Sequence, residues 1–350
     1  MRPTRRSPVS RSPARRTGAA LLGAGVAVLA SAAVAAPAHA AVTWGIADQK
    51  PETFANPAFL QLRDAGMTSA RYVIRFDALK YRNDAARSFY AQQADAWLQA
   101  ARAANVRPLV TFWVTASNSS SLKKAIPAAT FRTEFKRFRA AYPWVKDFSL
   151  FNEPNLTGPF RGKPEALGRL YRTISKDLKS CSDCRLLAGD IHLTSGTTDA
   201  AYALKVRRAA GMPIRIWGLN NYHDVNDRTA TDTSRFLRSS AVKSSKVWIT
   251  ESGGVYSRKA SSEKKSPFLA QRKKATSDSA RERYQYDATR YLKTLTGRYK
   301  QLQRAYIYQL QSEANPSWVP GTRNGSWDSG LLDPRGQQRR SFGYVLNSIL

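Results

Sequence analysis

The feature that most constrains this chain is a regular alternation of short apolar runs with longer amphipathic segments, starting near residue 42. Short apolar runs bounded by turn residues are typical of buried strands, and apolar residues spaced by three and four are typical of helices. The expected strands are 42–46, 70–74, 108–113, 148–151, 186–190, 214–221, 246–251 and 304–310. The expected helices are 57–65, 88–105, 128–142, 164–179, 198–210, 233–239, 278–296 and 341–349.

Eight strand–helix units in about 310 residues predict an α/β fold, a (β/α)₈ TIM barrel, with one domain over residues 41–350. The alternative is an open doubly wound sheet. That fold would be expected to carry a glycine-rich phosphate loop after an early strand, and the sequence contains no GxGxxG or Walker pattern.

Residues 1–40 are expected to lie outside the fold. Six arginines and no acidic residue precede an apolar stretch over 18–36, and Ala38-His39-Ala40 follows. This order is typical of a secretory signal peptide cleaved after Ala40, with a membrane anchor as the alternative. We therefore expect a secreted protein, exported by the Sec or the twin-arginine route, that has no membrane association after cleavage.

The chain has two cysteines, Cys181 and Cys184. In an oxidising compartment they are expected to close a small disulfide loop. A redox-active CxxC is the alternative, but such a motif normally opens a helix, and here it precedes an expected strand. With three histidines in the whole chain, no metal site is expected, and no cofactor motif is present.

The charge balance is strongly basic. The formal net charge is +31, and removal of the arginines in residues 1–40 leaves about +25. Such a charge attracts polyanions. The alternative interpretation is that it only keeps the protein soluble. A basic insertion over residues 257–276 follows the seventh expected strand, so one hypothesis is that it steers an anionic glycan or cell-wall polymer toward the site. The alternative is a solvated loop. We expect no nucleic-acid partner. We also expect the protein to be a monomer.

Two of the apolar runs end on a glutamate. The run 148–151 leads into Asn152 and Glu153, and the run 247–250 leads into Glu251. Because the carboxyl ends of parallel barrel strands meet at one rim, the two carboxylates are expected to face each other. Glycoside hydrolysis requires such a pair, and a separation of about 5–5.5 Å gives retention of configuration.

The two glutamates are expected to have different roles. Glu153 can protonate the leaving-group oxygen and later accept a proton from water, as a general acid/base with a raised pKa. Glu251 can attack the anomeric carbon as an ionised nucleophile. Asn152 can donate its amide to a sugar hydroxyl.

These residues resemble a known group of enzymes. Asn152-Glu153-Pro154 on the fourth expected strand and Glu251 on the seventh are similar to the motifs of the clan A glycoside hydrolases, which include the cellulase-like family 5. The resemblance spans about residues 42–350. It implies a retaining enzyme that cleaves β-glycosidic bonds of an oligo- or polysaccharide by double displacement.

The resemblance also implies supporting residues. Arg71, on the second expected strand, is assigned beside the nucleophile, with Arg75 as the rival on the same strand face. Tyr222 is assigned to contact the nucleophile from the sixth strand. Many members carry His-x-Tyr there, whereas this chain has Asn220 at the histidine position and His223 after the tyrosine.

Aromatic and histidine side chains near the strand ends are candidates for sugar contacts. Many members of the group have a tryptophan at the eighth strand end, but the run 306–311 has none. Trp113 and Trp318 are candidates to stack on sugar rings, with a packing role as the alternative. His192 and His223 are candidates either for substrate contacts or for structural hydrogen bonds.

The sequence is compatible with two classes of function. The first is a secreted retaining β-glycosidase that acts on a carbohydrate substrate. The second is a non-hydrolytic protein that binds a glycan or an anionic polymer on the same barrel. The glutamate pair favours the first class.

Overall fold

The computed structural model describes residues 41–114, 124–156, 158–194, 196–259, 277–312 and 326–350. The expected signal peptide over 1–40, the candidate Trp318 and most of the basic insertion lie outside these ranges.

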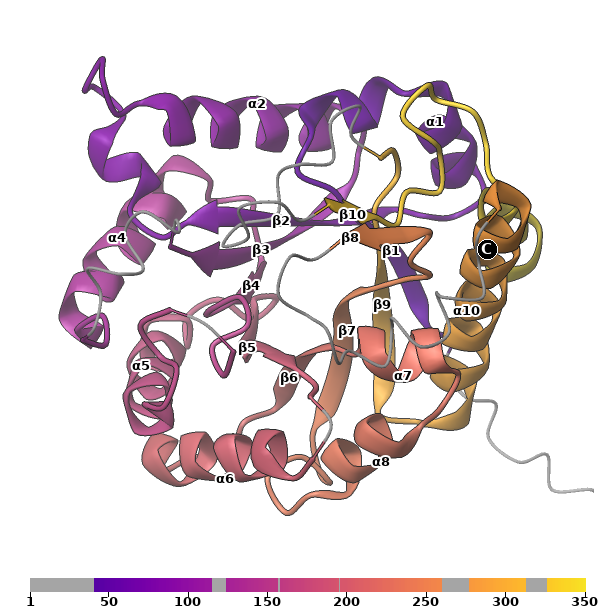
Figure 1. Cartoon of the computed structure of the whole chain (residues 1–350). Coiled ribbons are helices and arrows are strands. Elements are labelled where there is room, and N and C mark those ends of the chain that lie inside the picture. Colours follow the sequence, from indigo (N-terminus) through magenta and orange to yellow (C-terminus); the bar gives the residue numbers. More distant parts are fainter. Residues whose placement is uncertain (1–40, 115–123, 157, 195, 260–276, 313–325) are drawn as a thin grey trace, which may run out of the picture. The chain divides into compact units, whose positions relative to one another are not determined.

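Eight parallel strands close into a barrel in the order β1-β2-β3-β4-β5-β6-β7-β9 (Figure 1). These strands are β1 (Thr43–Ala47), β2 (Ser69–Arg75), β3 (Arg107–Trp113), β4 (Asp147–Ser149), β5 (Arg185–His192), β6 (Ile216–Asn220), β7 (Lys246–Ser252) and β9 (Leu302–Tyr308). Each coincides with an expected strand within a few residues, so the predicted (β/α)₈ barrel is confirmed. The fourth and seventh expected strands are β4 and β7, and the eighth is β9.

Helices surround the barrel (Figure 1). They are α1 (Pro57–Asp64), α2 (Phe89–Ala103), α4 (Ala128–Ala141), α5 (Pro164–Asp177), α6 (Thr198–Ala210), α7 (Tyr222–Asp227), α8 (Thr231–Arg238), α10 (Asp278–Arg298) and α11 (Arg340–Tyr344). Shorter turns are η1 (Pro51–Ala55), η2 (Ala78–Tyr81) and η3 (Val345–Ile349). In the described residues, no helix is long and apolar enough to cross a lipid bilayer.

Helix α5 illustrates why these segments are helical and where they pack. Pro164 occupies the first turn, where its missing N–H has no intrahelical partner to lose. Leu167, Leu170, Tyr171 and Ile174 are buried and recur at spacings of three and four, so they form one face. This apolar face fixes the helix against the sheet.

The hydrophobic core has two parts. The larger part lies between the barrel and its helices and includes Phe112 on β3 and Phe135 on α4, whose rings meet edge to face. The smaller part, with members on β1, β3, β5, β6, β7 and β9, consists of Ala47, Leu109, Leu187, Ile216, Trp248 and Tyr306. Because six of the eight strands contribute to the smaller part, the barrel is filled with side chains and the strand ends are held in register.

A two-stranded antiparallel sheet is separate from the barrel, with one strand after β7 in sequence and the other after β9. It consists of β8 (Ser257–Lys259) and β10 (Ser326–Asp328). Asp328 accepts two hydrogen bonds from the buried guanidinium of Arg339, at 2.6 and 2.8 Å, which ties β10 to the C-terminal segment. The first residues of the expected basic insertion are therefore a strand.

Cys181 and Cys184 form a disulfide between α5 and β5. The bond closes a short loop with a sequence separation of 3. The cysteines therefore cross-link only their own turn.

Candidate active site

Arg71 lies at the centre of a buried network inside the carboxyl end of the barrel. It projects from β2 and its side chain is fully buried. Nη2 donates to Asp190 Oδ2 at 2.6 Å, and Nη1 donates to Glu251 Oε2 at 2.8 Å. Nη2 also donates to Asn152 Oδ1 at 2.7 Å. One guanidinium thus connects the ends of β2, β4, β5 and β7, and charge-assisted hydrogen bonds of this kind are stronger than neutral ones.

Asp190, on β5, compensates the buried charge of Arg71. Its side chain has no exposed area. Thr111 donates to Oδ2 at 3.0 Å and Ser149 donates to Oδ1 at 2.6 Å, so both carboxylate oxygens have partners. Because a buried ion is stable only when it is paired and hydrogen-bonded, Asp190 fixes the position of Arg71.

Gly218 on β6 makes room for this carboxylate. A Cβ at this position would lie 2.2 Å from Asp190 Oδ1 and 2.9 Å from the backbone oxygen of Gly189. A side chain at residue 218 would therefore displace the carboxylate that holds Arg71.

We expect Gly218→Ala to destabilise the protein by about 1–3 kcal/mol, because extra volume in a packed region forces its neighbours to move. The matched control is Gly297→Ala in α10, where an added Cβ meets nothing within 4 Å and alanine is the better helix former. Urea unfolding of both variants checks this. Equal stability of the two variants would contradict the packing argument.

Glu251 lies near the end of β7 with two donors on its carboxylate. Arg71 binds Oε2, and the hydroxyl of Tyr222 donates to Oε1 at 2.9 Å. The ring of Trp327, on β10, packs edge to face on Tyr222 with ring centroids 4.9 Å apart. The carboxylate is therefore held at both oxygens, and its side chain is 18% exposed.

Glu153 follows β4 and has a left-handed backbone conformation with φ of 46°. Such a conformation is unfavourable for a residue with a Cβ and is concentrated at functional sites. His192 Nδ1 lies 2.8 Å from Oε1, and Asn220 Nδ2 donates to the same oxygen at 3.1 Å. The side chain is 21% exposed, so it is accessible like Glu251.

The two carboxyl groups differ in their electrostatic surroundings. Burial favours the neutral form of Glu153, but the charge and hydrogen bond of His192, with Asn220 and Arg71 adding to them, outweigh burial and lower the pKa of Glu153 to about 2. Burial raises the pKa of Glu251, with the charge of Glu153 adding to this effect and Arg71 and Tyr222 opposing it. The charge of Glu153 therefore acts on Glu251.

The structure brings together six residues named from the sequence, with His192 in a hydrogen bond to Glu153. Arg71, Asn152, Tyr222 and Glu251 form one hydrogen-bonded group with Asp190. Glu153 forms a second group with His192 and Asn220. The backbone joins the two groups, because the N–H of Glu153 donates to the carbonyl oxygen of Asp190 at 3.0 Å. Thr250, the chain neighbour of Glu251, also donates to the amide oxygen of Asn220.

The other predicted residues lie elsewhere or have different contacts. Arg75, the rival of Arg71, pairs with Asp77 at 2.5 Å. The ring nitrogens of His223 are each 3.3 Å from a carboxylate, one of Asp227 and one of Asp232. Trp113 ends β3 and is partly buried.

Sequence reasoning missed the contributions of Asp190, Asn220 and Trp327. A charged residue inside the apolar run of β5 was the available signal for Asp190, because buried carboxylates require a partner. Trp327 had no signal, since its position against Tyr222 depends on the pairing of β10 with β8.

Among the described residues, two groups have metal-ligand composition. One is Cys181, Asp183 and Cys184, and the cysteines of this group are joined in a disulfide. The other is His223, Asp224 and Asp232. Both oxygens of Asp224 already accept hydrogen bonds at the start of α8, from backbone N–H groups and a threonine hydroxyl. Both groups therefore have a structural explanation.

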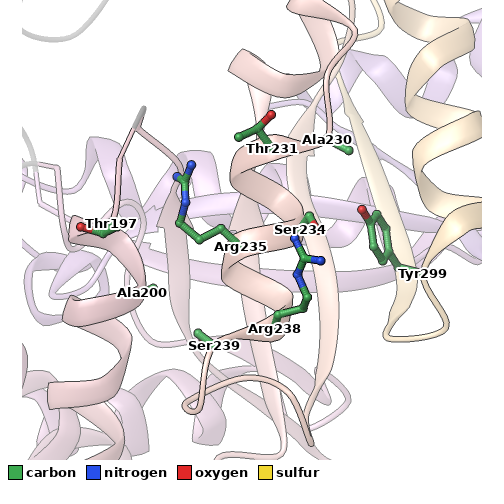
Figure 2. Close-up of a pocket in the computed structure, with 9 residues that line it drawn as sticks. All are labelled: Thr197, Ala200, Ala230, Thr231, Ser234, Arg235, Arg238, Ser239 and Tyr299. Carbon is green, nitrogen blue, oxygen red and sulfur yellow. The ribbon is translucent and has the colours of Figure 1, made fainter.

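A cavity of about 600 Å³ lies away from this network (Figure 2). It is open to the surface and lies between the first turn of α6, α8 and Tyr299, with Arg235 and Arg238 along α8 (Figure 2). Its lining residues are Thr197, Ala200, Ala230, Thr231, Ser234, Arg235, Arg238, Ser239 and Tyr299. None of these residues belongs to the network at the strand ends, so the candidate active site rests on that network and not on the cavity.

Comparison with known proteins gives a fold-level match. No protein-family model matches the chain, and no curated protein matches its sequence. Among solved structures, xylanase 10B from Thermotoga maritima matches with a TM-score of 0.57 at 12% identity, covering 88% of this chain and 94% of that chain. Xylanase B from Clostridium stercorarium F9 matches with a TM-score of 0.58 at 13% identity, covering 88% and 97%.

A structure described as one of two fungal β-1,4-galactanases also matches, with a TM-score of 0.58 at 13% identity over 88% of this chain and 100% of that chain. At these identities the likeness concerns the fold. The chain therefore has the barrel fold that is found in enzymes described as xylanases and a galactanase.

Proposed function

We propose that the protein is a retaining glycoside hydrolase that cleaves β-glycosidic bonds of an oligo- or polysaccharide. The observation that carries the proposal is the pair of partly exposed glutamates at the ends of β4 and β7, beside one buried guanidinium that binds Glu251. Arg71 contacts Glu251 directly and reaches Asn152, the residue before Glu153. Structural neighbours described as a xylanase and a galactanase support the reaction class.

In the first step, Glu251 attacks the anomeric carbon while the bond from that carbon to the glycosidic oxygen breaks. Glu153 gives its proton to this oxygen, and the rest of the substrate leaves as an alcohol. A covalent glycosyl-enzyme remains on Glu251. In the second step, a water molecule attacks the same carbon and loses a proton to Glu153, the bond to Glu251 breaks, and the free enzyme is restored.

The contacts of each glutamate fit its role. Arg71 and Tyr222 donate to Glu251, which stabilises the carboxylate that must attack. In the described residues, both hydrogen bonds to the Glu153 side chain fall on Oε1, so Oε2 is left for the glycosidic oxygen. Asn152 keeps its amide nitrogen for the sugar, because its oxygen accepts from Arg71.

The pKa directions of the resting site run opposite to these roles, and protonation of Glu153 removes one cause of the difference. The charge of Glu153 is one of the causes that raise the pKa of Glu251. When Glu153 holds a proton, that cause disappears, and the donors Arg71 and Tyr222 favour the ionised form of Glu251. The proposed mechanism requires a reactive state with neutral Glu153 and ionised Glu251.

The test is hydrolysis of a panel of aryl β-glycosides and β-linked polysaccharides by the parent protein, with the first product's anomeric configuration followed by proton NMR. We expect turnover of at least one substrate and initial release of the β-anomer. Arg238→Ala, in the cavity outside the network, is the matched control and should keep the parent's rate. Initial release of the α-anomer would contradict the mechanism. Binding of a glycan without turnover would favour the non-hydrolytic alternative.

A further inference from the structure

The imidazole of His192 has a position that the two-glutamate mechanism does not use. It lies at the end of β5, with Nδ1 2.8 Å from Oε1 of Glu153. The amide of Asn220 donates to the same oxygen. An amide does not titrate, whereas an imidazole can gain or lose a proton near neutral pH.

We infer that His192 is a positioning and proton-holding residue for Glu153, and that the imidazole and the carboxyl group share one titrating proton. The acid of the reaction is then the pair and not the glutamate alone. The kinetic consequence of this inference rests on the proposed glycosidase function, whereas the shared proton itself does not.

The pair has two forms with the same number of protons. In the first form, His192 is an imidazolium and Glu153 is a carboxylate. In the second form, Nε2 has lost its proton to water, Oε2 has gained one, and Nδ1–H still donates to Oε1. Only the second form can protonate a glycosidic oxygen. Because the two forms have the same number of protons, their ratio does not depend on pH, and loss of the shared proton lowers the amounts of both forms together.

The surroundings of His192 support a proton that is held above the ordinary range of an imidazole. Burial acts to lower the pKa of His192, but the charges of Glu153, Asp199 and Glu251 outweigh burial and raise it. These groups face the ring from the end of β4, from α6 and from β7. On the other side of the pair, the cation Arg71 on β2 acts on Glu153 and favours its carboxylate.

The backbone of His192 is anchored independently of its ring. The side-chain oxygen of Asn155 accepts from the His192 N–H at 3.0 Å, and the Asn155 amide donates to the His192 carbonyl at 2.7 Å. The same amide donates to Asp199 at 2.9 Å. Replacement of the imidazole therefore leaves the end of β5 attached to the segment that carries Glu153.

The first experiment is an NMR titration of the ring nitrogens in protein labelled with ¹⁵N-histidine. The chain has three histidines, and the His192→Asn variant identifies the signal of residue 192. In Glu153→Gln we expect the pKa of His192 to fall by about one unit or more, because the carboxylate that favours the imidazolium is gone. The signal of His223 is the internal control and should not move. An unchanged pKa of His192 would overturn the inference.

The second experiment is the pH profile of kcat/KM for His192→Asn, with His192→Gln as a second variant and thermal unfolding as the check on folding. The parent loses activity when the pair loses its shared proton. The variants have only the proton of Glu153, which leaves at lower pH, so their alkaline limb should move to lower pH by about one unit or more. At the acidic optimum their kcat should stay within about tenfold of the parent.

A structural role for His192 predicts a different result, namely an equal loss of kcat/KM at every pH, and that result would overturn the inference. Failure of the proposed function has a separate signature: the parent turns over no glycoside at any pH. In that case the ring titration still decides whether the pair shares a proton.

Discussion

Replacement of Glu251 by glutamine is expected to reduce kcat by at least about a thousandfold on every substrate. Glutamine has nearly the same shape, and its amide oxygen can accept from Arg71 while its NH₂ group donates to the Tyr222 hydroxyl, so the loss reports the missing nucleophile. Activity is measured on the best substrate of the panel. Because no leaving group can replace a missing nucleophile, an activated aryl glycoside should be affected as strongly as a polysaccharide.

Glu153→Gln is the matched comparison, because its effect should depend on the leaving group. A substrate whose leaving group is a weakly basic phenolate needs no protonation, so cleavage of its bond should be nearly unaffected. A substrate with a sugar alcohol as leaving group should lose about a hundredfold or more. The same leaving-group dependence in both variants would show that the roles of the two glutamates are assigned wrongly.

Asp190→Ala is expected to lower the free energy of unfolding by about 3–5 kcal/mol, because it leaves the fully buried Arg71 without its main counterion. The hydroxyls of Thr111 and Ser149 also lose their acceptor. Urea unfolding followed by circular dichroism measures the effect. Asp190→Asn should cost less, since an amide oxygen can still accept from those groups.

Asp64→Ala is the control for this measurement. Asp64 pairs with Arg63 on the surface, and its side chain is 68% exposed. An ion pair of this kind contributes between about 0 and 1 kcal/mol. If Asp190→Ala were as stable as Asp64→Ala, a group other than Asp190 would compensate the buried charge of Arg71. The network around Asp190 could then not be what fixes the position of the Glu251 side chain.

The barrel and the two glutamates could be predicted from the sequence because both depend on local pattern. The runs before Glu153 and Glu251 are short and apolar, and barrel topology alone places their ends on one rim. Tyr222 and Arg71 came from the resemblance to clan A motifs, and the structure places both within hydrogen-bond distance of Glu251.

The remaining contacts depend on register and on pairing between distant segments. His192 and Asn220 reach the same oxygen of Glu153 because they are register partners on β5 and β6, past a bulge between Leu187 and Asp190. Periodicity does not reveal a bulge. The Trp327 contact requires β10 to pair with β8 across a long stretch of sequence, which no local pattern indicates.

The central claim is that Glu251 forms a covalent bond with the sugar, and the most direct test is to trap that bond. The parent is incubated with an activated 2-deoxy-2-fluoro-β-glycoside of the sugar preferred in the panel, and its mass is measured intact and after proteolysis. We predict stoichiometric inactivation, with one fluorosugar on the peptide that contains Glu251 and none on Glu251→Gln. A label on Glu153 or another residue, or turnover without any covalent adduct, would contradict this account.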